Sequence, residues 1–340
     1  MTRRSSRRRR SARGGAAGEA SEAGHVPLSG EHLWEISKIT DPKQRGALAD
    51  ILEALSDDNY LLGRTLIAEL EFEAGMAKVM GKDISAKSLA LVRPTMGQAF
   101  GWVGGMKIRN RAGGDGSDAV RAQMTDAEFD KLMARLNFEF ERRVLRGPAD
   151  DDLEVLRADP NFRPEVAIES QKKRVLWELD TERVLNEGPR WRRGRLRDVV
   201  GARELVHEWM DMYTRMRIDR VKAGLPDFNP PDEELRSFMG SMPHTQVAIS
   251  VKTRYHKNPR HKWTVNDIVD IDAVSVAYAY GEAVFPDRAV RSALLNSKEL
   301  RVIGTFVPRR PDELTEWLDA LPTVVAPDLL VPHPLTRPVG

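Results

Sequence analysis

The order of helical and strand-like patterns along the chain predicts an α/β fold that is interrupted by a large helical insertion. Short strand-like runs alternate with helical patterns near both ends of the chain, whereas the middle contains long helical patterns only. Alternating strands and helices are typical of a domain whose helices cover the faces of a sheet. We therefore predict a core formed by about 25–100 and 238–321, with a helical insertion at about 101–237.

The first half of this core is predicted to begin after a low-complexity segment, residues 1–24. That segment is rich in Arg, Ser, Ala and Gly and has almost no large apolar side chain, so we predict that it is disordered. The apolar run at 25–28 suggests the end of a strand. Ser29 and Asp41 are each suited to cap a helix. A further helix is predicted around 60–79.

The middle of the chain predicts helices separated by one Gly-rich connector at 101–116. This connector has no Walker or dinucleotide spacing, so we interpret it as a mobile link and not as a phosphate-binding loop. Thr125 and Glu128 have the spacing of a capping box. Long helical patterns follow at about 164–186 and 197–223, and the broad apolar stripe of the second is typical of a core face.

The C-terminal part predicts the second half of the α/β core. Asp232 is expected to cap a short helix. The run 247–251 alternates apolar and polar residues, which is compatible with a strand, although the surrounding residues also have helical spacing. The remaining expected elements are a helix, two strands, a last helix and a Pro-rich surface or disordered tail, at 267–277, 283–285, 301–307, 312–321 and 322–340.

The composition excludes several classes of protein and of site. The chain has 340 residues, of which 41% are apolar and 31% charged, as is normal for a globular domain. No apolar run approaches the roughly 20 residues of a membrane span, and the basic start lacks the apolar segment of a signal peptide. Cysteine is absent, which excludes disulfides and Cys-ligated zinc and favours the cytoplasm.

Positive charge is concentrated in three clusters, although the net charge is only +2. Seven of the first thirteen residues are Arg, and a second cluster lies at 190–197. Such clusters are either solvated faces or sites that neutralise phosphates. The third cluster runs directly into an acidic stretch, and its members are Arg254, His256, Lys257, Arg260, His261 and Lys262.

The acidic stretch, Asn266–Asp287, contains the most informative candidates for a functional site. Asp267 and Asp270 are expected on one helix face, with Asp272 pointing away, and Glu282 and Asp287 at the two ends of the following strand. Gathered carboxylates stay ionised when a cation neutralises them, and oxygen ligands favour Mg²⁺ or Mn²⁺. That chemistry suits phosphodiester hydrolysis. The alternative is that these acids are helix caps and surface charges.

The segment NDIVDIDAVSVAYAYGEAVFPDR, residues 266–288, resembles the C-terminal motif of PIN-like domains. In that motif an Asp begins a helix of small and apolar residues, and further acids lie on the extended segment that follows. Asp270 matches the helix-start acid, Asp287 with Arg288 matches the acid at the strand end, and Glu282 matches an acid between them.

The segment HVPLSGEHLWEISKI, residues 25–39, is similar to the second PIN-like motif. Ser29 and Glu35 occupy its Ser and Glu positions. The resemblance covers about 25–80 and 238–320. It implies a three-layer α/β/α fold with a mainly parallel sheet, in which the insertion interrupts the PIN-like domain, 25–321.

The resemblance also implies a function: a metal-dependent nuclease, most plausibly an endoribonuclease acting on single-stranded RNA. Mg²⁺ or Mn²⁺ would be held by Glu35, Asp270, Glu282 and Asp287, of which Glu35, Asp270 and Asp287 would be catalytic. Ser29, Asn266, Asp267 and Arg288 would support the site. No antitoxin or other protein partner is indicated. The phosphate backbone would be steered by Arg254, Lys257, Arg260 and Lys262, while Trp263 would stack on a base or belong to the core.

Three departures from the family pattern favour an alternative function. The first strand and its catalytic Asp have no counterpart, since no Asp precedes Asp41. Glu282 replaces the more usual Asp, and Pro286 precedes Asp287 where Thr is common. The alternative is therefore a catalytically inactive module that binds RNA or a protein, or a helical interaction protein whose acids are only caps.

Overall fold

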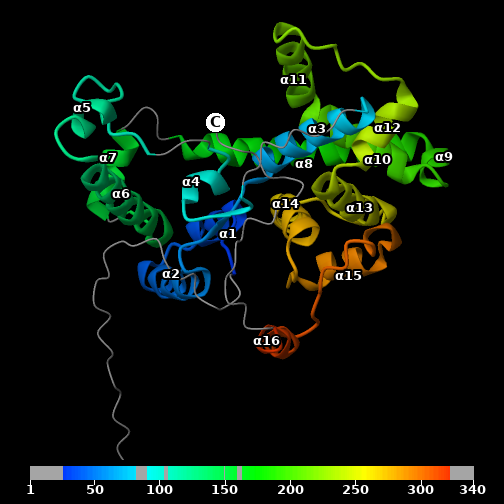
Figure 1. Ribbon diagram of the computed structural model, residues 1–340. Coiled ribbons are helices and arrows are strands. Elements are labelled where there is room, and N and C mark those ends of the chain that lie inside the picture. The colour runs from blue at the N-terminus through cyan, green and yellow to red at the C-terminus, as the bar shows by residue number, and fades with distance from the viewer. Residues whose placement is uncertain (1–25, 82–89, 103–105, 149, 159–162, 322–340) are drawn as a thin grey trace, which may run out of the picture.

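The structure, a computed structural model, consists mainly of helices (Figure 1). Helix accounts for 69% and strand for 3% of the residues that the structure describes, so the predicted three-layer α/β/α fold with a mainly parallel sheet is wrong. The predicted disorder at 1–24 and the tail at 322–340 lie outside the described residues. The ranges that the structure describes are 26–81, 90–102, 106–148, 150–158 and 163–321.

The N-terminal helices begin where the sequence predicts. The Ser29 hydroxyl accepts a hydrogen bond from the His32 amide at the start of α1, and Asp41 accepts one from the Lys43 amide at the start of α2. Each cap satisfies backbone donors that have no partner inside the helix. The elements of this part are α1 (Gly30–Ser37), α2 (Pro42–Ser56), β1 (Tyr60–Leu61), α3 (Arg64–Val79), β2 (Val92–Arg93) and α4 (Met96–Ala99).

The described sheet is one antiparallel pair, β1 with β2. The other strand-like runs make only isolated bridges: Leu28 pairs with Tyr60, and Ala283 with Phe306, both in parallel. The strand expected at 301–307 is wrong, because a 3₁₀ turn, η2 (Lys298–Leu300), precedes it and Gly304 turns the chain with a φ of 80°. Single paired residues cannot extend into a ladder, so helices replace the expected sheet.

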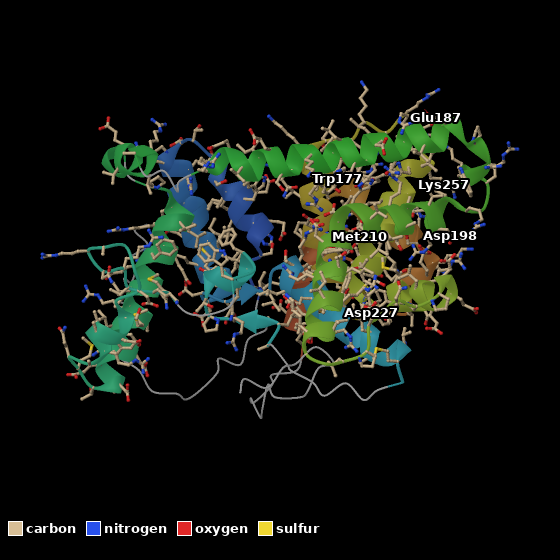
Figure 2. The ribbon with its side chains drawn as sticks, turned by 90° about the horizontal axis from the view of Figure 1, so that it is seen from above. Trp177, Glu187, Asp198, Met210, Asp227 and Lys257 are labelled. Atoms are coloured by element: carbon tan, nitrogen blue, oxygen red, sulfur yellow. The ribbon has the colours of Figure 1, made fainter. Side chains whose placement is uncertain are left out.

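The middle of the chain is helical, as expected. Thr125 and Glu128 form the predicted capping box. Helix α8 runs across the molecule from the side of the α5–α7 group to α9 (Figure 1), and Figure 2 shows the helix with Trp177 along it and Glu187 at its end. The helices of this part are α5 (Ser117–Arg121), α6 (Asp126–Arg146), α7 (Asp150–Ala158), α8 (Pro164–Glu187) and α9 (Pro189–Arg192).

The next helices surround α13. Helix α12 begins after Pro231, so Asp232 is its first helical residue and not the cap that the sequence predicts. Between α10 and α11 the chain forms one π-helical segment, a distortion often found at functional sites. These elements are α10 (Leu196–Glu204), η1 (Leu205–Trp209), α11 (Met210–Lys222), α12 (Asp232–Gly240) and α13 (Pro243–Lys257).

The run 247–251, which the sequence leaves open between strand and helix, is helical and belongs to α13. This helix contacts α3, α10, α12, α14 and α15, and residues on nearly every side of it are buried. A helix covered on all sides has no polar face, so its sequence lacks a clear 3.6-residue period and can imitate the alternation of a strand. The last helices are α14 (Val265–Tyr280), α15 (Arg288–Asn296) and α16 (Pro311–Asp319).

Two large apolar cores lie on opposite sides of α13. One joins α3 with α10–α12 through the rings of Phe72, Trp209, Tyr213 and Phe238, and the other joins α13 with α14 and α15. A smaller core holds α1, α2 and α6 together. None of the helices in the described ranges combines the length and the apolar composition that crossing a membrane requires.

Candidate functional site

Helices α1 and α14 bring two distant parts of the sequence together. The Lys38 ammonium donates to Glu35 Oε1 at 2.6 Å and to Asn266 Oδ1 at 3.3 Å. The end of α1 is thereby fixed beside the start of α14. Asp270 lies one helical turn after Asn266, on the same side of α14.

Four carboxylates gather at this junction, and we call them the outer carboxylate cluster: Glu35, Asp267, Asp270 and Asp287. The pKa of Asp270 is raised to about 6, mainly by partial burial and then by the charges of Asp287, Glu35 and Asp267, against the opposing charge of Lys38. A carboxyl group responds in this way when other negative charges lie close to it. Carboxylates of α1, α14 and the start of α15 therefore all act on Asp270.

The four acids of this cluster differ in their hydrogen-bond and ion-pair partners. Asp267 accepts hydrogen bonds from the amide and hydroxyl of Thr264 at the start of α14, and Asp287 accepts one from the Val290 amide at the start of α15. Both are therefore helix-capping residues, and the placement of Asp287 at a strand end is wrong. Asp270 has no hydrogen-bond or ion-pair partner among the described residues.

The remaining residues predicted for the acidic site lie outside this cluster. Glu282 is exposed beyond the end of α14, and no hydrogen bond or ion pair of its side chain joins it to the cluster within the described part of the chain. Arg288 is exposed at the first position of α15. Ser29 acts as the α1 cap, so it supports the position of Glu35 without touching it.

The oxygen atoms of the outer carboxylate cluster are suitable ligands for a hard cation. Carboxylate oxygens and the Asn266 amide oxygen are ligands of the kind that Mg²⁺ and Mn²⁺ prefer. In the described ranges, however, no three Asp, Glu, His or Cys side chains are close enough to share one ion. Holding a metal would therefore require side-chain rotation, for which the exposed Glu35 and Asp270 have freedom.

Beneath α1 lies a set of buried charges that the sequence did not reveal. We call it the buried charge network: Arg64, Arg174, Glu178, Glu204, Glu208, Lys252 and Asp272. Arg174 holds both oxygens of Asp272, at 2.5 and 2.7 Å, and Arg64 reaches the same carboxylate at 2.9 Å. Asp272 does point away from Asp270, as expected, but into this network.

Lys252 is the centre of the other half of the buried charge network. Its ammonium lies 2.6 Å from Glu204, 2.7 Å from Glu178 and 3.5 Å from Glu208. Burial raises the pKa of Glu178, but Lys252 and His256 outweigh burial and hold that pKa at about 2. For Glu204 burial prevails and the pKa is raised despite Lys252.

A sequence signal for this network exists in hindsight. Charged residues recur four apart within apolar helical stripes, at Arg174 and Glu178, at Glu204 and Glu208, and at Lys252 and His256. Such spacing places each pair on one helix face. The pairing partners are 34 to 208 residues apart, so no local pattern could identify them.

Helix α1 connects the buried charge network with the outer carboxylate cluster. Glu31 lies one turn before Glu35. Burial and the charge of Asp272 raise the pKa of Glu31, against the opposing effects of a Ser29 hydrogen bond and of Arg64. One helix thus presents successive carboxylates to the interior and to the surface.

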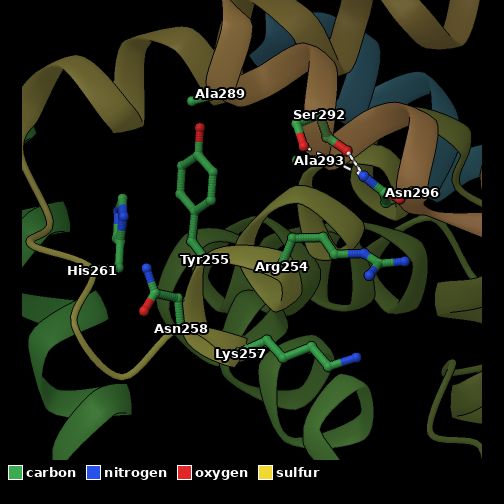
Figure 3. A pocket seen from close by; sticks show the side chains of 9 residues that line it. All are labelled: Arg254, Tyr255, Lys257, Asn258, His261, Ala289, Ser292, Ala293 and Asn296. Atoms are coloured by element: carbon green, nitrogen blue, oxygen red, sulfur yellow. Dashed lines mark hydrogen bonds between the residues drawn. The ribbon is translucent and has the colours of Figure 1, made fainter.

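Two of the four predicted phosphate-steering residues line a groove. Arg254 and Lys257 of α13 are among the residues that line a groove between α13 and α15 (Figure 3), whereas Arg260 and Lys262 are exposed outside it. Trp263 is 7% exposed and packs against the rings of Tyr255, His256 and His261. It belongs to the core and has no free face for a base.

Neutralising Asp270 is expected to stabilise the protein at neutral pH. Its pKa is raised from 3.8 to about 6, so above pH 6 the folded state keeps an unfavourable charge that Asp270→Asn removes. Because the Asp270 side chain is exposed, solvent screening limits the increase in the free energy of unfolding to about 1 kcal/mol. The gain should shrink as pH falls from 6 to 4, because the folded carboxyl then binds a proton.

Thermal unfolding of the parent chain and of Asp270→Asn at pH 7.5, 6 and 4 measures this effect. Asp219→Asn, at an exposed position of α11, is the matched control and should show no such trend. An equal difference in melting temperature at all three pH values would contradict the repulsion at Asp270.

Comparison with known proteins identifies no relative: no family model matches the chain, and neither curated proteins nor solved structures give a match.

Proposed function

We propose that this protein is a Mg²⁺- or Mn²⁺-dependent nuclease that hydrolyses phosphodiester bonds of single-stranded RNA at the outer carboxylate cluster. The observation that carries the proposal is Asp270, a carboxyl without a partner among the described residues, whose pKa is raised by partial burial and by three further carboxylates. A bound cation would relieve that repulsion. The absence of cysteine agrees with action in the reducing cytoplasm.

In this proposal Glu35, Asp270 and Asp287 would hold the metal, and Glu282 would approach it only after movement of its segment. Bound metal would activate water and stabilise the charge on the reacting oxygens. Asn266 would orient Asp270 and Glu35 through Lys38, which bridges Asn266 and Glu35.

The positive side chains would guide the substrate, while two further residues would shape the site. Asp267 and Ser29 would fix the helices that carry the acids, through their capping hydrogen bonds. The phosphate backbone would be neutralised by Arg254, Lys257, Arg260, Lys262 and Arg288.

A second candidate function is RNA or protein binding without catalysis. It is favoured by the ion pair between Lys38 and Glu35, which already neutralises one of the acids. It is also favoured by the spacing of the acids, which requires rotation before three of them could share an ion. This candidate predicts salt-dependent binding without metal-dependent cleavage.

The two candidates are separated by an RNA cleavage assay. Purified protein should cleave a labelled single-stranded RNA in Mn²⁺ but not in EDTA, and Asp270→Asn should reduce the rate by at least about 100-fold, since correct placement of metal ligands controls catalysis. Mn²⁺ should also raise the melting temperature of the parent chain more than that of Asp270→Asn.

Asp219→Asn is again the control and should cleave like the parent chain. Cleavage that survives in Asp270→Asn would remove the proposed site. RNA binding without cleavage by the parent chain, in any divalent cation, would establish the second candidate.

A further inference from the structure

A groove of about 440 Å³ lies between the C-terminal part of α13 and one face of α15. Ala289, Ser292, Ala293 and Asn296 form its α15 wall. These four residues repeat at helical spacing, so the wall extends along roughly 10 Å of α15 at 1.5 Å per residue. The groove is long enough for a small ligand to lie along the helix. Figure 3 shows the other wall, formed by Arg254, Tyr255, Lys257, Asn258 and His261.

The chemistry of the groove favours an anion. Arg254 and Lys257 bring two positive charges, and none of the nine lining residues is acidic. Within the described part of the chain, Arg254 makes a single weak hydrogen bond, from Nε to Ser297 Oγ at 3.4 Å. Its two terminal nitrogens thus remain available to an incoming phosphate, for which the guanidinium geometry is well suited.

The groove also offers a neutral donor and a neutral acceptor. Asn258 Oδ1 accepts from the Arg260 amide at 3.1 Å, so its Nδ2 is the group left to donate. Asn296 Nδ2 donates to the Ser292 carbonyl at 2.8 Å, so its Oδ1 is the group left to accept. One donor and one acceptor on side-chain amides are groups that can hydrogen-bond to the Watson–Crick edge of an unpaired base.

Tyr255 lines the groove, and its hydroxyl is also under the electrostatic influence of the outer carboxylate cluster. Burial raises the pKa of its hydroxyl, and so do the charges of Asp267, Asp287 and Asp270. Figure 3 places that hydroxyl next to Ala289, near the start of α15 that Asp287 caps. The Tyr255 hydroxyl therefore points toward the start of α15, at the end of the groove nearest to Asp287.

We propose that this groove binds one nucleoside monophosphate unit of a single-stranded nucleic acid, next to the bond that is cut. The phosphate lies at Arg254 and Lys257, and the base edge meets Asn258 and Asn296. A volume of this size is within the range of small-ligand sites, and an unpaired base is required because a paired one hides this edge. The proposal deepens the proposed function and rests on it for the position of the cut.

Binding is tested without cleavage, in EDTA, with the Asp270→Asn chain. Fluorescence anisotropy follows a labelled single-stranded RNA, and unlabelled AMP, inorganic phosphate and duplex RNA are the competitors. The double variant Arg254→Ala/Lys257→Ala should weaken binding at least tenfold. The slope of the logarithm of the binding constant against the logarithm of the salt concentration should also become less steep by about 1.4, the value for two phosphate contacts on a single strand.

A second variant tests the groove at constant charge. Ser292 is exposed, so Ser292→Trp fills the groove without disturbing the core and should also weaken binding at least tenfold. Arg301→Ala removes one exposed charge outside the groove and is expected to bind within twofold of the parent. AMP should compete, and inorganic phosphate and duplex RNA should compete much less.

Unchanged binding by both groove variants would overturn the proposal, and so would equal competition by inorganic phosphate and AMP. Loss of binding in these variants without any metal-dependent cleavage by the parent chain would instead reject the nuclease and keep the groove. If the parent chain cleaves RNA and the groove variants bind RNA as well as the parent does, the nuclease proposal stands and the groove proposal is rejected.

Discussion

Replacing Lys252 by methionine is expected to destabilise the protein by about 3–5 kcal/mol, the usual cost of leaving buried charges without their partner. The Lys252 side chain is 2% exposed and its ammonium lies among Glu178, Glu204 and Glu208. Methionine keeps most of the volume of the side chain, so the loss reports the missing charge and not a cavity. Urea unfolding measures it as a lower midpoint with an unchanged slope.

A double variant shows whether the loss arises from repulsion between the acids. Burial already raises the pKa of Glu204, so Glu204→Gln in the Lys252→Met chain should recover part of the stability. Lys298→Met, at an exposed position, is the control and should change stability by less than about 0.5 kcal/mol. A Lys252→Met chain as stable as the parent would mean that the network is rearranged or hydrated.

Replacing Glu71 by alanine should cost a similar amount, about 3–5 kcal/mol, because four buried or half-buried donors would lose their acceptor. Glu71 is 1% exposed. It accepts from the amide and Nδ1 of His244, at 2.6 and 3.0 Å, and from the hydroxyls of Thr245 and Tyr280, at 3.3 and 2.5 Å. One carboxylate on α3 thus joins the start of α13 to the end of α14.

Glu71→Gln separates hydrogen bonding from the presence of a side chain. Its amide oxygen still accepts, so the loss should be about 1–2 kcal/mol, smaller than for alanine. Glu169→Ala, on the exposed side of α8, should leave the urea midpoint unchanged. Equal losses of stability for Glu71→Gln and Glu71→Ala would show that the negative charge of Glu71, and not hydrogen bonding to a neutral oxygen, stabilises the start of α13.

Helix boundaries were the part of the structure that the sequence predicted best. Ser29, Asp41 and the Thr125–Glu128 pair begin helices as expected, because a cap and the amide that it satisfies lie within three residues of each other. The error at Asp232 was a shift of one position, since Pro231 precedes the first helical residue. Signals of this kind are local and need no knowledge of the fold.

The candidate site was predictable only in part. The charges of Asp287 and Glu35 help to raise the pKa of Asp270, while the role of these three residues as metal ligands stays a prediction. Glu282 stays outside, because the strand expected to carry it is reduced to a single bridge at Ala283. The groove was signalled only by Arg254 and Lys257, since its α15 wall consists of small and neutral residues without a charge pattern.

The sequence by itself determined where helices begin, where charge is concentrated and which acids are candidates for a metal, because these properties depend on neighbouring residues. The tertiary structure decided the rest. It made the run 247–251, which the sequence left open between strand and helix, part of α13, whose burial on nearly all sides hides its period. It also paired Arg64 with Asp272 across 208 residues. It also decided that of the acids between Asn266 and Asp287, Asp272 is neutralised inside while Asp270 keeps its charge at the surface. Charges are compensated by whatever lies nearest in space, and chain order does not contain that information.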